Sequence, residues 1–182
     1  MNERIRKADL DLLAQAGLAP EDVEHSVMVA GIALDIAKSL KTETDLELVA
    51  RGALFHDLGK VRTSSIRHGL EGASIGEALG LPRPVLDIME KHVRAGVPRE
   101  QAAAYELPDK DFSLTRIEEK LVIYADKLSD ILEEQDLARD LDDARARFAG
   151  ILSARPDLAK DEATRERYLA LRRDIEALAA PE

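Results

Sequence analysis

The sequence predicts an all-α protein, on three observations. Ala, Leu, Glu, Arg and Lys, which favour helices, dominate most segments of the chain. Apolar residues recur at steps of three and four, a spacing that places them on one face of an α-helix. No stretch alternates apolar and polar residues for long enough to indicate a strand. Since 182 residues is the size of one domain, we expect residues 1–182 to form a single all-helical domain.

Turn-forming residues divide the first third of the chain into helices. Gly17 and Pro20 interrupt the first apolar pattern, and the pattern resumes after them. Gly59 fits a helix stop placed directly after His56 and Asp57. We therefore predict helices over residues 3–16, 21–40 and 44–57.

Prolines mark the later helix starts. Pro82, Pro84 and Pro98 stand where helical patterns begin, and proline is favoured in the first turn of a helix. The segment "YELPDKDFS", residues 105–113, is expected to be a surface connection. The remaining predicted helices are 69–80, 83–94, 98–104, 114–132, 136–152 and 162–179.

The chain becomes charge-dense from about Asp136 onward, as in "ARDLDDARARF" and "KDEATRERYLALRRDIEAL". Such stretches are typical of amphipathic helices whose charged residues face solvent. We expect this part of the chain to pack on the preceding helices or on another subunit, which makes a homodimer plausible.

Composition and charge exclude several classes of protein. The formal net charge is −10, which disfavours a nucleic-acid polymer as a partner because phosphate backbones attract basic surfaces. The chain has no Cys, so thiol nucleophiles, zinc–thiolate sites and disulfides are ruled out. The N-terminal segment lacks the apolar core of a signal peptide, and no run reaches the length of a membrane span. We therefore expect a cytoplasmic protein with no membrane partner.

The four histidines lie on or beside helix faces that should point inward. His25 shares the apolar face of its helix, and His56 is joined to Asp57 at the end of an apolar run. His68 and His92 continue the apolar faces of later helices. One such histidine is usually a core residue with a hydrogen bond. Four of them, one adjoining an aspartate, fit better with convergence on a shared site.

Asp126 is a further candidate for that site, because it interrupts the apolar run "KLVIYADKLSDIL". An unpaired carboxylate at a core position would be costly to bury. Imidazoles and carboxylates together form a ligand set for borderline metals such as Fe, Mn, Co, Ni or Zn. The residues alone leave the choice among these metals open.

The order of these residues resembles the HD superfamily of metal-dependent phosphohydrolases, an all-helical family. "HDLGK" is similar to its central motif, and "RHGLEGASIGEALGLPRPVLDIMEKHVRAG" is similar to the segment that adds two histidines in dinuclear members. The resemblance covers roughly residues 22–130 and is closest to a group of short, stand-alone HD proteins. It implies a compact HD-domain fold, with a metal-binding core over 20–132 and a C-terminal helical extension over 133–182.

The resemblance also implies a role for each ligand in a centre of two divalent or transition metal ions. One metal ion would be held by His25, His56 and Asp126. A second would be held by His68 and His92, with Asp57 bridging the two ions. Iron or manganese is favoured. A water activated beside Asp57 would be the nucleophile, which makes Asp57 the predicted catalytic residue.

Charged residues near the ligands are candidates for further roles. Lys60 follows the His-Asp pair closely enough to approach a phosphate, and Arg67 and Arg94 each adjoin a ligand histidine. Glu71 and Asp130 are candidates for supporting the ligands or accepting a proton. The alternative for each is an ordinary solvent-exposed residue.

The leading prediction is a phosphohydrolase that acts on a nucleotide or another small phosphorylated metabolite. Two alternatives share the ligand set: a mixed-valent di-iron oxygenase on a small substrate, and a metal-binding regulatory module without turnover. The hydrolase is preferred because hydrolases are more frequent in the superfamily, which is an argument from association. Specificity would depend on loops such as 58–67 and 105–113, whose shape the sequence does not define.

Overall fold

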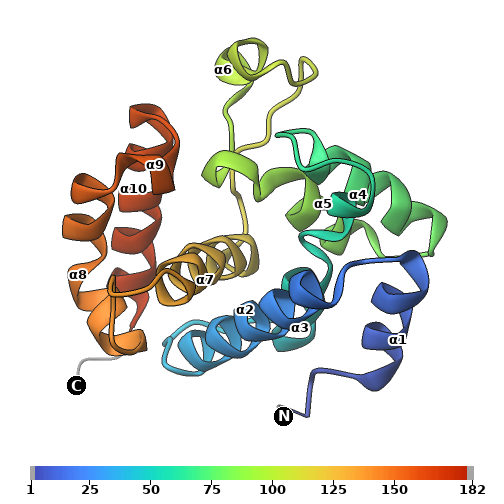
Figure 1. Cartoon of the computed structure of the whole chain (residues 1–182), viewed down its shortest axis with the longest axis horizontal. Coiled ribbons are helices and arrows are strands. Elements are labelled where there is room, and N and C mark those ends of the chain that lie inside the picture. Colours follow the sequence, from blue (N-terminus) through green and yellow to red (C-terminus); the bar gives the residue numbers. More distant parts are fainter. Residues whose placement is uncertain (1–2, 180–182) are drawn as a thin grey trace.

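The structure, a computed structural model, describes residues 3–179, and its regular elements there are helices (Figure 1). The all-α prediction is confirmed. Within the described residues, β-type pairing is confined to a single bridge between Leu40 and Ala179. In chain order the elements are α1 (Lys7–Ala16), α2 (Pro20–Lys38), α3 (Leu46–Phe55), η1 (Leu58–Val61), α4 (His68–Ala78), α5 (Arg83–Lys91), η2 (Val93–Ala95), α6 (Arg99–Ala102), η3 (Ala103–Tyr105), α7 (Ile117–Glu133), α8 (Leu141–Ala154), α9 (Pro156–Ala159) and α10 (Glu162–Leu178).

The centre of the molecule is a packed group of four helices. α2 packs against both α3 and α7, and α5 packs against α3 (Figure 1). Each helix directs an apolar face inward, and burial of such faces is the main favourable term in folding. Among the fully buried side chains of this group are Val29, Leu34, Val49, Leu54, Ile88, Met89, Leu121 and Ile123.

Several helix boundaries differ from the prediction. α1 begins at Lys7 and not at residue 3, and α3 ends at Phe55, so His56 and Asp57 lie between it and η1. α8 begins at Leu141, because Asp136 has a left-handed φ of 66° that a helix does not accept. The short helix α9 was not predicted at all.

Gly59 marks a close approach between η1 and α4, and the prediction that it stops a helix is wrong. It lies inside η1, and its φ is not among the positive ones. A Cβ built on Gly59 would lie 1.8 Å from the carbonyl oxygen of His68 and 2.6 Å from the amide nitrogen of Gly72. Only glycine permits this contact, which brings Asp57 beside His68.

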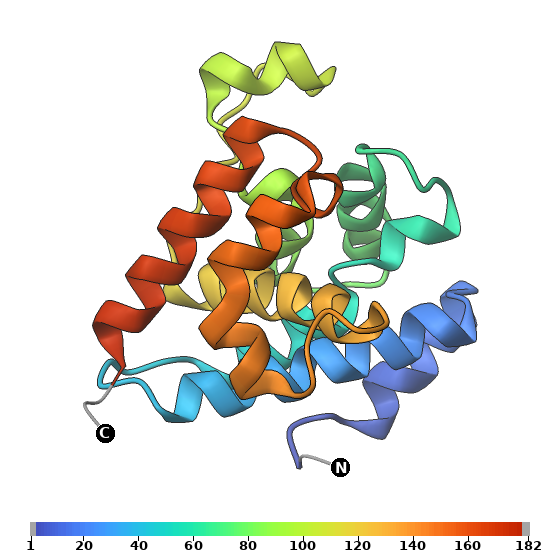
Figure 2. The same cartoon turned by 60° about the vertical axis from the view of Figure 1, so that its left-hand side comes forward.

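The C-terminal helices α8 to α10 join the same hydrophobic core. The ring of Tyr124 on α7 lies 5.1 Å from that of Phe148 on α8, and both side chains are fully buried. Leu171 and Ile175 of α10 are also buried, and α10 packs on α7. Figure 2 shows α8 and α10 side by side across this part of the molecule.

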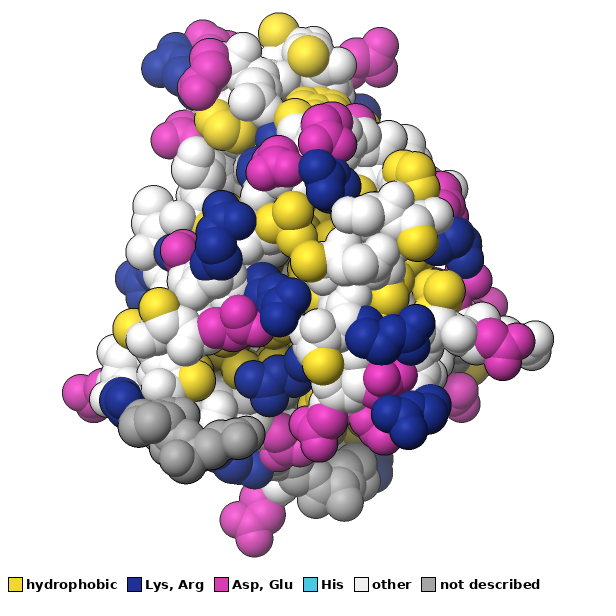
Figure 3. All heavy atoms as spheres, turned by 90° about the vertical axis from the view of Figure 1, so that its left-hand side faces the viewer, with side chains coloured by type: hydrophobic (Ala, Val, Ile, Leu, Met, Phe, Trp, Pro, Cys, Tyr) yellow, Lys and Arg dark blue, Asp and Glu magenta, His cyan; other side chains and the backbone are white. Residues whose placement is uncertain are grey.

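The outer surface of these helices is mixed in charge. Basic and acidic side chains alternate over the face in Figure 3, and no histidine is seen on it. This agrees with the prediction that their charged residues face solvent. In the part of the chain that the structure describes, no helix is both long and apolar enough to cross a membrane.

Candidate metal centre

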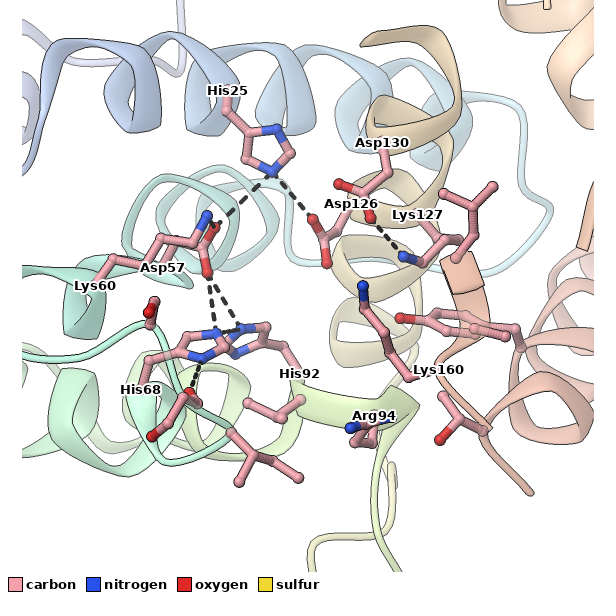
Figure 4. Close-up of a pocket in the computed structure, with 18 residues that line it drawn as sticks. His25, Asp57, Lys60, His68, His92, Arg94, Asp126, Lys127, Asp130 and Lys160 are labelled. Carbon is pink, nitrogen blue, oxygen red and sulfur yellow. Dashed lines mark hydrogen bonds and ion pairs between the residues drawn. The ribbon is translucent and has the colours of Figure 1, made fainter. Parts of the chain in front are cut away.

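The predicted ligands converge from five places in the chain on one buried point. Figure 4 shows all of them except His56. His25 comes from α2 and Asp126 from α7, while the pair His56–Asp57 follows α3. The two others stand at helix ends: His68 is the first residue of α4, and His92 follows the last residue of α5. Burial is deep, since His56 is fully inaccessible and Asp57 and His92 are each only 4% exposed.

The carboxylate of Asp57 lies between two pairs of histidines. Its Oδ2 is 3.3 Å from Nε2 of His56 and 4.0 Å from Nε2 of His25. Its Oδ1 is 3.2 Å from Nε2 of His68 and 3.4 Å from Nε2 of His92. Each carboxylate oxygen therefore faces a different pair of imidazole nitrogens.

Asp126 adds a second carboxylate to one of these pairs. Its Oδ1 lies 3.1 Å from Nε2 of His25 and 3.5 Å from Nε2 of His56. His25, His56 and Asp126, with one oxygen of Asp57, thus form one donor set. His68, His92 and the other oxygen of Asp57 form a second.

Backbone carbonyls fix the orientation of three of the imidazole rings. Nδ1 of His56, His68 and His92 lies 2.6, 2.7 and 2.7 Å from the carbonyl oxygen three residues earlier. A carbonyl oxygen can only accept, so Nδ1 is the donor and carries the hydrogen. Each Nε2 is then left with its lone pair directed at the centre, the form in which histidine binds a metal.

The nitrogen lone pairs fit a bound cation. Nε2 of His56 is buried and makes no hydrogen bond, an arrangement that is costly unless something binds there. Nε2 of His68 and Nε2 of His92 approach each other to 2.8 Å. Two lone pairs at this distance repel unless a cation or proton lies between them. The residues therefore fit a metal centre.

The electrostatics of the centre also favour cations. For Asp57 and Asp126, burial alone would raise the pKa, but the neighbouring histidines outweigh it and hold both pKa values well below the usual range. Burial lowers the pKa of His92. It would lower that of His25 as well, but the hydrogen bond and charge of Asp126 prevail and raise the pKa of His25 to about 9. Two ionised carboxylates in a buried site attract positive charge.

The ligands open onto a pocket of about 390 Å³. Lys60 stands at its edge, with Nζ 2.6 Å from Oδ2 of Asp57 and 3.1 Å from Oδ1 of Asp22. Arg94 and Asp130 also line the pocket. The structure therefore brings three of the predicted charged residues to the centre.

Arg67 and Glu71 are not brought there, contrary to the prediction. Nη1 of Arg67 donates to the carbonyl oxygen of Glu106 at 3.3 Å. Glu71 accepts from Nη1 of Arg62 at 3.0 Å, and both side chains line a separate surface depression. For Arg67, proximity in sequence to His68 was misleading, because consecutive residues of a helix do not face each other.

Sequence reasoning missed other residues of the site. Glu133 accepts from Nδ1 of His25 at 3.0 Å, and its spacing from Asp126 and Asp130 on one helix face could have indicated it. Lys127 directly follows a ligand in an apolar run, and it is only 6% exposed. Nothing in the sequence indicated the pocket residues of the C-terminal part, which include Leu158, Lys160, Thr164 and Tyr168.

An all-helical chain with these donors defines a protein with a histidine–aspartate metal-binding centre. Residues 22–131 match the HD domain family, and this chain belongs to that family.

Relatives match part of the chain. Over 109 residues the chain is 41% identical to an uncharacterised protein of Methanocaldococcus jannaschii. This match covers 58% of the present chain and 64% of the relative. Over 119 residues it is 39% identical to the tRNA (cytidine(56)-2'-O)-methyltransferase of Thermoplasma volcanium, covering 65% of this chain and 35% of that enzyme. The chain thus spans less than two thirds of either relative.

Solved structures share the fold. The HD domain of the phosphodiesterase PgpH of L. monocytogenes, in complex with cyclic-di-AMP, matches with a TM-score of 0.57 and 17% sequence identity. This match covers 94% of the present chain and 100% of the other. A second structure of that domain gives a TM-score of 0.56 at 18% identity.

Proposed function

We propose that this protein is a phosphohydrolase with a dinuclear metal centre that acts on a nucleotide or another small phosphorylated metabolite. The observation that carries the proposal is the position of Asp57, whose two oxygens face different histidine pairs at 3.3 and 3.2 Å. A carboxylate placed in this way suits two cations a short distance apart. Nitrogen and oxygen donors without sulfur are consistent with iron or manganese.

In this proposal the ligands divide as the sequence predicted. His25, His56 and Asp126 would hold one ion, His68 and His92 the other, and Asp57 both. When bound, the ions would lower the pKa of water towards neutrality and withdraw charge from a phosphoryl group.

The chain's own side chains would bind and orient the substrate. Nζ of Lys60, beside Oδ2 of Asp57, would donate to a phosphate oxygen held at the centre. Asp130, which lines the pocket, would exchange a proton with the leaving oxygen. Burial and the charge of Asp126 raise the pKa of Asp130.

The substrate class is supported by the charge of the pocket and by the solved structures. Lys60, Lys127, Lys160 and Arg94 all line the pocket, which would suit a phosphorylated compound more than a neutral one. Cyclic-di-AMP, bound to the similar HD domain of PgpH, is a nucleotide. These observations favour hydrolysis over the oxygenase reaction, which uses the same ligands.

A substrate panel tests the proposal. The protein is loaded with manganese or iron and assayed on nucleotides, cyclic dinucleotides and phosphomonoesters, with and without oxygen. We expect metal-dependent phosphate ester or anhydride cleavage that does not need oxygen.

Two variants accompany the panel. Asp57→Asn should abolish turnover and metal retention. Asp35 is an exposed aspartate paired with Lys38, so Asp35→Asn should keep both turnover and bound metal. Oxygen-dependent product formation with mixed-valent iron would instead indicate the oxygenase. Bound metal with no turnover on any substrate would indicate the regulatory module.

A further inference from the structure

One wall of the pocket comes from the C-terminal extension, which holds no proposed metal ligand. Leu158, Ala159 and Lys160 at the end of α9 line the pocket, with Thr164 and Tyr168 of α10. Figure 4 shows Lys160 across the pocket from His68. The extension packs through its apolar residues on α7. Its place beside the centre therefore needs no lysine, and the presence of one calls for an explanation.

Lys160 has an unfavourable backbone conformation. Its φ is 70° and its ψ is −36°, in a region that residues with a Cβ rarely adopt. The backbone N–H of Lys160 closes the last turn of α9 by donating to the carbonyl oxygen of Pro156 at 3.0 Å. Glycine would make the same turn without strain, so a lysine at this position carries a conformational cost.

The other cations of the pocket are already paired. Lys60 contacts Asp57 and Asp22. Lys127 contacts Asp130 and lies over the ring of Tyr168, with Nζ 5.2 Å from its centroid.

Arg94 is also paired, since its Nη1 lies 3.1 Å from Oδ2 of Asp161. By contrast, Nζ of Lys160 makes no ion pair or side-chain hydrogen bond with any residue from 3 to 179. In Figure 4 the ammonium group of Lys160 points into the pocket. A cation without an ion-pair partner, directed into a pocket, favours an anionic ligand there.

We propose that Lys160 binds a second anionic group of the substrate. The substrate would then be a small molecule with two anionic groups: the phosphoryl group that reacts at the metals, and a further phosphoryl or carboxylate group. This deepens the proposed function and rests on it for the first group. At about 390 Å³ the pocket has more room than one phosphate needs.

Binding of non-hydrolysable probes to the metal-loaded protein tests the inference. Methylphosphonate carries one anionic group, phosphonoacetate adds a carboxylate, and methylenediphosphonate adds a second phosphonate. Isothermal titration gives each dissociation constant, and metal content is measured after every titration. We expect at least one two-anion probe to bind about tenfold more tightly than methylphosphonate, as a charge-assisted hydrogen bond would provide. Whichever two-anion probe binds more tightly, methylenediphosphonate or phosphonoacetate, identifies the second group as phosphoryl or carboxylate.

The variants are Lys160→Gln and Lys160→Gly, with Lys41→Gln as matched control. Lys41 is another exposed lysine, and it lies outside the pocket. Both Lys160 variants should lose the roughly tenfold advantage of the two-anion probe and keep methylphosphonate binding within about twofold. Lys160→Gly should also melt at a higher temperature than Lys160→Gln, because glycine relieves the backbone strain. Lys41→Gln should match the parent protein.

The results distinguish a failure of the anion subsite from a failure of the proposed function. If both Lys160 variants bind the two-anion probes as tightly as the parent does, the second subsite is wrong, even if phosphate esters are hydrolysed. If no two-anion probe binds more tightly than methylphosphonate, the subsite is likewise wrong. A Lys160-dependent preference in a protein that hydrolyses no phosphate compound would overturn the proposed function and keep the anion subsite.

Discussion

His25 differs from the other histidines of the centre in what holds its ring. The others donate from Nδ1 to backbone carbonyls, which no side-chain substitution removes. Nδ1 of His25 instead faces the carboxylate of Glu133, at 3.0 and 3.1 Å from its two oxygens. The orientation of His25 can therefore be changed without touching a proposed ligand.

Glu133→Ala is expected to lower the affinity for the metal by about 10- to 100-fold, since groups that orient a ligand histidine typically have effects of this size. The control is Glu134→Ala, which removes a neighbouring carboxylate that contacts Arg155 at 3.6 Å. Competition with a chromophoric chelator measures both affinities. Equal affinities in the two variants would mean that Glu133 does not support His25.

At the scale of residues, the sequence indicated which side chains point inward but not what surrounds them. The histidines and Asp126 could be recognised because each stands on or beside an apolar face. Arg94 reaches the pocket because its φ is 57°, a turn that helical spacing does not foresee. Glu133 was missed because a partly exposed glutamate looks like any other acid on a solvated helix face.

At the scale of elements, the contact between η1 and α4 sets the distance from Asp57 to His68. Gly59→Ala places a methyl group 1.8 Å from a backbone carbonyl oxygen, which no side-chain rotation can relieve. The two elements must separate. We expect a loss of about 3 kcal/mol or more in the free energy of unfolding, at the upper end for overpacked sites.

Gly31→Ala is the control for this variant, since a Cβ at Gly31 on α2 meets nothing within 4 Å. It should raise the free energy of unfolding by about 0.5–1 kcal/mol, the usual gain from alanine inside a helix. Urea unfolding measures both. A Gly59→Ala protein as stable as the parent would show that η1 and α4 need not be so close.

Asp161 caps α10 and joins it to the pocket wall. Its Oδ1 accepts from the backbone N–H of Thr164 at 2.7 Å, and its Oδ2 accepts from the hydroxyl of Tyr105 and from Arg94, each at 3.1 Å. Burial alone would raise the pKa of Asp161, but these donors lower it below the usual aspartate value. The charged carboxylate therefore stabilises the folded state above the ordinary aspartate pKa. This contribution is lost as the pH falls through the lowered pKa.

Asp161→Ala should accordingly lower the free energy of unfolding by about 0.5–2 kcal/mol near neutral pH, as loss of a helix cap does. The stability difference from the parent should begin to narrow below about pH 4, where Asp161 of the unfolded parent takes up a proton, and should narrow further as the pH falls through the lowered pKa of the folded state. Urea unfolding over a pH series measures this difference. Asp140→Ala, which removes the cap of α8, should destabilise the protein to a similar degree. A difference that grows as the pH falls would contradict the assignment for Asp161.

The prediction of elements was reliable where patterns were long and failed at short ones. α7, with its buried run between Leu121 and Ile131, could be placed within a few residues. α9 spans only Pro156–Ala159 and has too few residues to show a period. Its position on the pocket depends on packing between distant segments, which no local pattern encodes.

At the scale of the whole molecule, the C-terminal extension and the metal-binding core share one continuous set of buried apolar residues. We expect calorimetry to give a single unfolding transition, as a single domain does. Phe148→Ala should lower the stability of the whole protein by about 3–5 kcal/mol, because Phe148 packs on Tyr124 across the boundary between the two parts.

The exposed Met28, at 40% accessibility, provides the control: Met28→Ala should change stability by less than about 0.5 kcal/mol. Two transitions, of which Phe148→Ala lowers only one, would show that the extension is a separate domain. The homodimer stays a prediction, which sedimentation equilibrium of the same samples would test.

The pocket is built from two stretches of chain, and this has a consequence for how such proteins diverge. Every proposed metal ligand lies within residues 22–131, which match the family, whereas Lys160 and Tyr168 come after them. Under the proposed function, substitutions in the later stretch would alter which compound is accepted without disturbing the proposed reaction. An ancestral enzyme could thus gain new substrates by changing a peripheral helix, and its descendants would share a reaction while differing in metabolic role.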